Sequence, residues 1–206
     1  MSDTSVAELT FCPLAGDAAS LARLLSVEGA LRQGHFRLLS GRHTDKFLAF
    51  SAIAAETAAL DQIASWLRPA VEAWAPDSVL APTTAGVGLA ATLARMMSLP
   101  LQLAAAGPEG RPSVLVGTPA PLAGRVLLVN DVTTTGTALG ALAGLAETSG
   151  GVVAGAAWFA SRQIGGELSL PFPTAHVADV DLPSWPEQEC GLCSTDPAPE
   201  NARDLN

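Results

Sequence analysis

Apolar residues recur along the chain at two spacings, one typical of helices and one typical of buried strands. Leucines follow helical spacing from Asp17 to about Gln33, where Gly34 is a plausible stop. A second amphipathic stretch runs over residues 56–74, and shorter ones over 87–97 and 138–149. We therefore predict four helices. Residues 1–14 carry no periodicity and are expected to form a loose arm.

Short apolar runs without a polar face alternate with these helices. The segment 36–50 is mixed around Ser40-Gly41, which predicts two short strands joined by a turn. Strands that alternate with helices and lack a polar face indicate an α/β fold, with a mostly parallel twisted sheet and helices on both faces. The expected strands of this sheet are 78–81, 101–104, 113–116, 126–129, 152–160 and 175–180.

Length and charge narrow the possible classes of protein. With 206 residues, the chain is expected to form one domain. Its formal net charge of -9 argues against non-specific nucleic-acid binding, which needs a basic surface. Seven acidic residues against one arginine fall in the last 28 positions, so an acidic, solvated tail is expected there. Because no apolar run is long enough to span a bilayer, we expect a cytoplasmic protein that does not bind membranes.

Three cysteines are too few for a disulfide framework and suit a reducing compartment. Cys190-Gly-Leu-Cys193 has the spacing of half a zinc site, but a structural zinc needs four ligands. His176 and Cys12 could supply the missing ligands only if the fold brought them to the two cysteines. Metal binding, redox chemistry and a packed or inert tail all stay open for the two cysteines, and no metal ligand is assigned. His35 and His43 are expected to be packing or surface histidines.

Chemistry is expected where strands of a parallel sheet end. The strand ending at Val129 is followed by Asn130 and Asp131, then by Thr133, Thr134, Thr135, Gly136 and Thr137, where the next helix begins. Free N–H groups of a helix start, added hydroxyl donors and a glycine that allows close approach predict a cradle for a phosphate. It is neither a Walker A loop nor a dinucleotide fingerprint. The alternative is an ordinary threonine-capped helix.

This segment resembles the phosphoribosyl-pyrophosphate (PRPP) signature of type I phosphoribosyltransferases, and the chain is most similar to the orotate branch. Gly34–Phe47 resembles the N-terminal Gly-x-Phe-x-Leu-x-Ser-Gly element of that branch, and Pro82–Gly88 stands where the family places its pyrophosphate loop. Cys190–Cys193 resembles the Cys-x-Leu-Cys ending of one bacterial group. The resemblance implies an N-terminal helix and small hood over residues 1–55, an α/β core over 56–182 and the acidic tail over 183–206.

The resemblance also implies roles for single residues. Asp131 would meet the ribose hydroxyls of PRPP as the catalytic residue, with Asn130 beside it. Arg162 would face the orotate carboxylate, and Lys46 or Arg42 would supply positive charge. A magnesium ion would bridge the pyrophosphate and ribose oxygens, and the working unit would be a homodimer. The 5-phosphate would lie on Thr133, Thr134, Thr135, Gly136 and Thr137, and the pyrophosphate on Thr84, Ala85 and Gly86.

Three departures from the family pattern leave more than one function open. Asn130 replaces the first of two acidic residues, the stretch 104–114 has Arg111 as its only cation, and Leu39 stands where some members carry a lysine. One hypothesis is an enzyme that makes orotidine 5'-monophosphate and pyrophosphate from orotate and PRPP, with weakened activity. The alternatives are a non-catalytic PRPP-binding or regulatory relative, and a transferase for a different base.

Overall fold

The large sheet is built from eight strands in a computed structural model that describes residues 10–38, 40–107, 111–117, 122–162, 168–195 and 198–205. Its strands lie in the order β1-β10-β9-β7-β4-β5-β6, with β8 also paired to β9. The five strands from β10 to β5 are parallel, and the outer strands β1 and β6 are antiparallel to their neighbours. The bounds are β1 Phe11–Pro13, β4 Ser78–Pro82, β5 Leu101–Ala106, β6 Pro112–Leu115, β7 Gly124–Val129, β8 Val132–Thr133, β9 Gly151–Ser161 and β10 Thr174–Val180.

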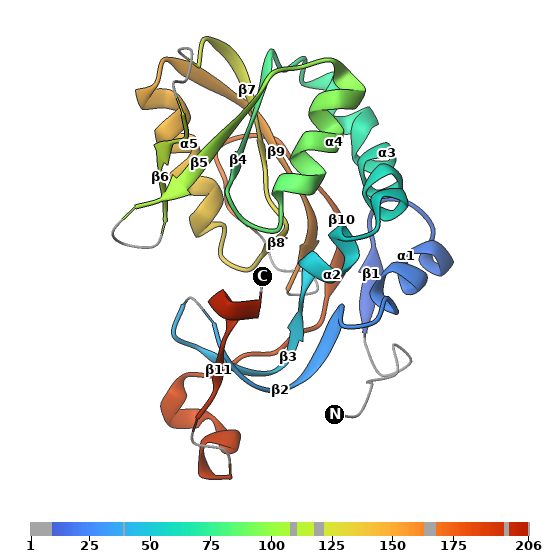
Figure 1. Cartoon of the computed structure of the whole chain (residues 1–206), viewed down its shortest axis with the longest axis vertical. Coiled ribbons are helices and arrows are strands. Elements are labelled where there is room, and N and C mark those ends of the chain that lie inside the picture. The colour runs from blue at the N-terminus through green and yellow to red at the C-terminus, as the bar shows by residue number, and fades with distance from the viewer. Residues whose placement is uncertain are drawn as a thin grey trace.

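Helices cover both faces of this sheet, as the sequence predicts (Figure 1). On one face α3 (Thr57–Ala73) and α4 (Val87–Met97) pack on the strands, together with α1 (Ala18–Leu25) and α2 (Phe50–Ala54). On the other face the strands are covered by α5 (Thr137–Thr148). Because successive strand residues point to opposite faces, Leu127 and Leu128 enter different hydrophobic clusters. Within the described residues, no helix combines the length and apolarity that crossing a membrane requires.

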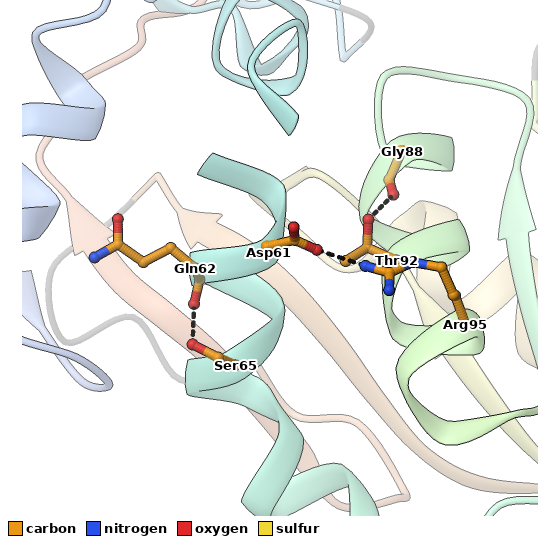
Figure 2. A network of polar contacts seen from close by, with 6 residues as sticks. All are labelled: Asp61, Gln62, Ser65, Gly88, Thr92 and Arg95. Atoms are coloured by element: carbon orange, nitrogen blue, oxygen red, sulfur yellow. Dashed lines mark hydrogen bonds and ion pairs between the residues drawn. The ribbon is translucent and has the colours of Figure 1, made fainter. Parts of the chain in front are cut away.

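The packing of α3 against α4 fixes the N-terminus of α4, where the loop that follows β4 ends. A Cβ on Gly88 would lie 3.0 Å from Leu60 Cδ1, so the absence of a side chain at Gly88 lets the two helices approach closely. Farther along, Arg95 Nη2 lies 2.6 Å from Asp61 Oδ1 (Figure 2). Both side chains of this ion pair are more than half exposed, so it contributes little stability. Apolar packing therefore positions α4 and its N-terminus.

A second, three-stranded sheet forms the hood. It consists of β2 (Leu31–Arg37), β3 (His43–Leu48) and β11 (Glu200–Asn201) in the order β11-β2-β3. Figure 1 shows the C-terminal segment lying against this hairpin, beyond the large sheet. The segment after Leu182, expected to be a solvated tail, also forms a backbone bridge between Trp185 and His43 and three 3-10 turns at Glu187–Glu189, Gly191–Ser194 and Ala202–Leu205. It is part of the hood's structure.

The prediction of one helix over residues 17–33 is wrong. Helix α1 ends at Leu25, and Gly29 adopts a left-handed φ of 79° that a helix interior does not allow. The chain then enters β2, whose residues pair with β3 on one side and β11 on the other. The predicted turn at Ser40-Gly41 is confirmed, with Gly41 at φ 78°.

The loose arm predicted for residues 1–14 is also wrong in part. Phe11–Pro13 form β1, which pairs with β10 in register Phe11 to Val180. Residues 1–9 lie outside the described chain. The other predicted helices and strands of the core lie where their spacing predicts them, whereas α2 and β8 were not predicted.

Candidate functional site

The threonine loop lies at the carboxyl edge of the parallel strands. After β7 ends, β8 pairs with the end of β9, and the chain turns into α5 at Gly136. Gly136 has φ 73°, a left-handed conformation in which a Cβ would lie 2.9 Å from Leu168 Cδ2. Glycine is therefore needed here. The hydroxyls of Thr135 and Thr137 lie 2.8 Å apart at the first turn of α5, beside the free N–H groups of a helix start.

A second loop packs directly against this one. It connects β4 to α4 through Thr83, Thr84, Ala85 and Gly86. A Cβ on Gly86 would lie 3.0 Å from the Asp131 backbone nitrogen and 3.1 Å from the Asn130 carbonyl carbon. The two predicted loops, which are separated by more than forty residues in the sequence, are therefore in contact at this point. Both begin at carboxyl ends of adjacent parallel strands, where ligands bind in such sheets.

Asp131 lies between the two loops and is only 7% exposed. Burial raises the pKa of its carboxyl above the ordinary 3.8, while hydrogen bonds from the backbone N–H groups of Val132 and Asp131 itself oppose that rise. Its own carbonyl accepts from the backbone nitrogens of Phe159 at 2.9 Å and Ala160 at 3.3 Å. The backbone of Asp131 is thus held rigidly. Its buried carboxylate becomes more stable in the charged form when a hydroxyl donor or a cation approaches.

Asn130 is 5% exposed, and its buried side chain forms hydrogen bonds within the threonine loop. Its amide nitrogen lies 3.4 Å from the Val132 carbonyl oxygen and 3.4 Å from Thr133 Oγ1. These are long hydrogen bonds that an aspartate could not donate. Asn130 therefore helps to shape the threonine loop, which is a structural reason for an amide at this position.

Arg162 connects the threonine loop to the hood. Its backbone nitrogen donates to the Thr133 carbonyl at 3.0 Å. Its Nη2 lies 3.3 Å from Thr44 Oγ1 and 3.4 Å from the carbonyl oxygens of Lys46 and Leu182. The side chain is 5% exposed, and burial lowers the pKa of its guanidinium to about 10, although nearby Asp45 opposes that fall. These hydrogen-bond partners are all neutral, so a planar carboxylate would be a better one.

The other predicted cations lie on the hood. Lys46 is half-buried on β3, whereas Arg42 is exposed and donates to Ser184 through both Nε and Nη2. Arg42 thus holds the C-terminal segment. Arg111 directly precedes β6 and is exposed, and Leu39 lies outside the described residues.

Two further features were missed from the sequence. Thr44, fully buried on β3, accepts from Arg162 and donates 2.7 Å to the Pro183 carbonyl. Its position between His43 and Asp45-Lys46 in the hairpin was the available signal. The side chains of His35, His43, Cys190 and Cys193 come together, so the two histidines expected to be packing or surface residues lie beside the cysteines. His176 instead lies 2.7 Å from Asp179 and stacks on Trp158.

Comparison with known proteins points to one group of relatives. The chain is 32% identical to an orotate phosphoribosyltransferase of Thermus thermophilus over 167 residues, which is 80% of this chain and 90% of that protein. It is 27% identical to the orotate phosphoribosyltransferase of Carboxydothermus hydrogenoformans, covering 84% of this chain and 91% of the relative. The crystal structure of orotate phosphoribosyltransferase from Aeropyrum pernix superposes with a TM-score of 0.63 and 27% identity, over 77% of this chain and 93% of that one.

Other likenesses concern the fold alone. An adenine phosphoribosyltransferase from Thermoanaerobacter pseudethanolicus superposes with a TM-score of 0.52 at 22% identity, over 64% of this chain and 86% of that one. No family model matches the chain.

Proposed function

We propose that this chain, which belongs to the orotate phosphoribosyltransferase family, transfers phosphoribose from PRPP to orotate and releases pyrophosphate. The product is orotidine 5'-monophosphate, a precursor of pyrimidine nucleotides. The observation that carries the proposal is the contact of Gly86 with Asn130 and Asp131, which joins a small-residue loop to a threonine loop at one edge of the sheet. A ligand with phosphate groups at both ends of a ribose fits such a pair of loops.

PRPP would lie across the two loops. The 5-phosphate would bind at Thr133–Thr137, where hydroxyls and helix N–H groups donate. The pyrophosphate would lie against Thr84, Ala85 and Gly86, in the loop that the absence of a side chain at position 86 allows to pack on Asn130 and Asp131. The ribose between them would then present its hydroxyls to Asp131.

The reaction breaks the bond between ribose carbon 1 and the pyrophosphate oxygen, and a ring nitrogen of orotate supplies the electron pair of the new bond. The ring nitrogen releases its proton to solvent, and pyrophosphate leaves with the electrons of the broken bond. Positive charge develops on the ribose, so the Asp131 carboxylate beside it would be worth most in the transition state. Its buried, rigid setting keeps water from screening that interaction.

Arg162 would bind the orotate carboxylate. Its guanidinium is buried at the junction of hood and core, and its described partners are neutral oxygens. Binding a carboxylate would give the buried cation an ion-pair partner. Lys46, whose carbonyl accepts from Arg162, would add positive charge on the same side.

Magnesium is the metal that this donor set suits. Asp131 offers carboxylate oxygens, Asn130 an amide oxygen and the threonines hydroxyls, and Mg²⁺ prefers oxygen ligands while keeping several waters. Asp131 and Asn130 would hold the ribose end to which the ion is bound. When present, the ion neutralises charge on the pyrophosphate leaving group.

The test is direct. Purified protein is incubated with PRPP, magnesium and orotate, and the loss of orotate absorbance is followed, while PRPP binding is measured by calorimetry. Turnover supports the enzyme. PRPP binding without turnover would leave the non-catalytic relative, and turnover only with another base would indicate a different transferase.

Two features of the site favour the non-catalytic alternative. The buried Asn130 supplies no negative charge, and the described part of the β5–β6 hairpin presents Arg111 as its cation. Fewer cations near a leaving group mean less stabilisation of its charge, at roughly 3 kcal/mol for one strong donor. These features are consistent with a slow enzyme as well.

We further propose a cytoplasmic homodimer. A count of three cysteines, too few for a disulfide framework, supports a reducing compartment. Light scattering of the purified chain tests the dimer, and a monomer at assay concentration would contradict it.

A further inference from the structure

The C-terminal Cys-x-x-Cys and two histidines of the hood hairpin meet in one place. His35 lies on β2 and His43 on β3, and both are less than 5% exposed. Cys190 and Cys193 come from the two short turns that follow Trp185. One ligand atom from each residue lies within 4.8 Å of the other three. These groups lie on the hood, outside the two loops described for PRPP.

The distances among these atoms lie near the edges of a metal tetrahedron, and the two that involve His43 Nδ1 are somewhat shorter. His35 Nε2 and His43 Nδ1 are 2.9 Å apart, and His43 Nδ1 and Cys193 Sγ are 3.2 Å apart. His35 Nε2 lies 3.5 Å from Cys190 Sγ and 3.7 Å from Cys193 Sγ. Bond lengths of about 2.0 Å to nitrogen and about 2.3 Å to sulfur give tetrahedral edges of about 3.3–3.8 Å. The four atoms therefore surround a point at which one ion fits.

The structure assigns a zinc-binding site in a structural role to His35, His43, Cys190 and Cys193, and this assignment does not rest on the proposed function. Two thiolates and two imidazoles form a donor set that favours zinc over the hard cation magnesium. All four positions of the tetrahedron come from the protein, which is typical of structural rather than catalytic zinc.

The site would clamp the C-terminal segment onto the hood. The cysteines lie 147 or more positions after the histidines in the sequence, so one ion closes a very long loop. The same segment already contacts the hairpin through the backbone bridge between Trp185 and His43 and through Thr44 Oγ1 and the Pro183 carbonyl. Thr44 in turn contacts Arg162. Zinc would thereby hold β3 in the position from which it contacts the arginine.

The experiment measures metal in the full chain, expressed without added metal and dialysed against metal-free buffer. Mass spectrometry of the elements should find one zinc per chain. Cys193→Ser should reduce the bound zinc at least tenfold, while Cys12→Ser and His176→Gln, which change the third cysteine and the third histidine, should keep it. Wild-type protein without zinc, or equal loss in the two control variants, would overturn the proposal.

A second measurement does not depend on the folding of a variant. Cobalt added to metal-free wild-type protein should give the intense visible bands and the thiolate charge-transfer band of a tetrahedral centre with two sulfur ligands. Zinc should then displace the cobalt and abolish the spectrum. A weak octahedral spectrum would overturn the assignment. So would a native mass spectrum of metal-free protein with a mass two hydrogens below that of the reduced chain, because that difference would mean a disulfide between Cys190 and Cys193.

Discussion

Replacing Asp131 by asparagine separates the binding role of its charge from the effect of that charge on stability. Asparagine has nearly the same shape and keeps an oxygen that can accept the backbone N–H of Val132. The change therefore removes a negative charge from a position that is 7% exposed without opening a cavity. We expect the variant to lose turnover and to gain stability in the absence of ligand.

The sign of the stability change follows from the raised pKa. A carboxyl whose pKa is higher in the folded than in the unfolded protein contributes most stability below the unfolded value, which is 3.8, and loses that contribution as pH rises through the folded value. At neutral pH the ligand-free wild type thus carries the cost of a buried charge. Each unit of the rise corresponds to about 1.4 kcal/mol, or a shift in melting temperature of about 3–5 °C for a chain of this size.

Two assays check this prediction. Calorimetric melting of the ligand-free proteins at neutral and mildly acidic pH should show a higher melting temperature for Asp131→Asn at neutral pH and a smaller gap on acidification. Turnover should fall about 10²–10³-fold, the loss typical of one strong electrostatic contact to a transition state. The control is Asp77, an exposed residue directly before β4 whose carboxylate accepts a hydrogen bond from the Arg125 backbone nitrogen. Asp77→Asn should leave turnover unchanged. Undiminished turnover, or a lower melting temperature in Asp131→Asn, would refute the reasoning.

Three other substitutions test the site. Asn130→Asp should lower the melting temperature of the ligand-free protein, because it removes two amide donations and buries a second carboxylate, yet it should raise turnover with magnesium; no change in either quantity would contradict the role given to Asn130. Gly86→Ala should weaken PRPP binding in calorimetry by about 1–3 kcal/mol, since its Cβ would press on backbone atoms 3.0 Å away, whereas Gly140→Ala, with no atom within 4 Å, should bind normally. Arg162→Lys should raise KM for orotate about 10–100-fold with little effect on KM for PRPP, because lysine keeps the charge but loses the planar fork; equal effects on both substrates would indicate a purely structural arginine.

The parts of the fold that depend on local spacing could be predicted from the sequence. The helix expected over residues 56–74 is observed at Thr57–Ala73, and the strand, threonine loop and helix around Asp131 follow in the expected order. In both places a helical period or a glycine and hydroxyl pattern within a few residues determines the conformation. Leucine spacing alone misled the prediction for residues 26–33, because pairing with β3 determines the end of that segment.

The full histidine and cysteine cluster could not be predicted, because the cysteines are far from the histidines in the sequence. Only the histidine pair had a usable signal, since His35 and His43 lie on opposite sides of the turn at Gly41 and the hairpin brings them together. Nothing in the sequence shows that the C-terminal segment returns to that hairpin. The burial of Arg162 against Thr44 has the same origin, since hood and core meet only in the folded chain.

The most direct test of the central claim is product analysis after mixing the protein with PRPP, magnesium and orotate. The account predicts orotidine 5'-monophosphate and pyrophosphate in equal amounts by chromatography, and neither product when orotate is omitted. PRPP bound in calorimetry but no orotidine 5'-monophosphate formed would contradict it.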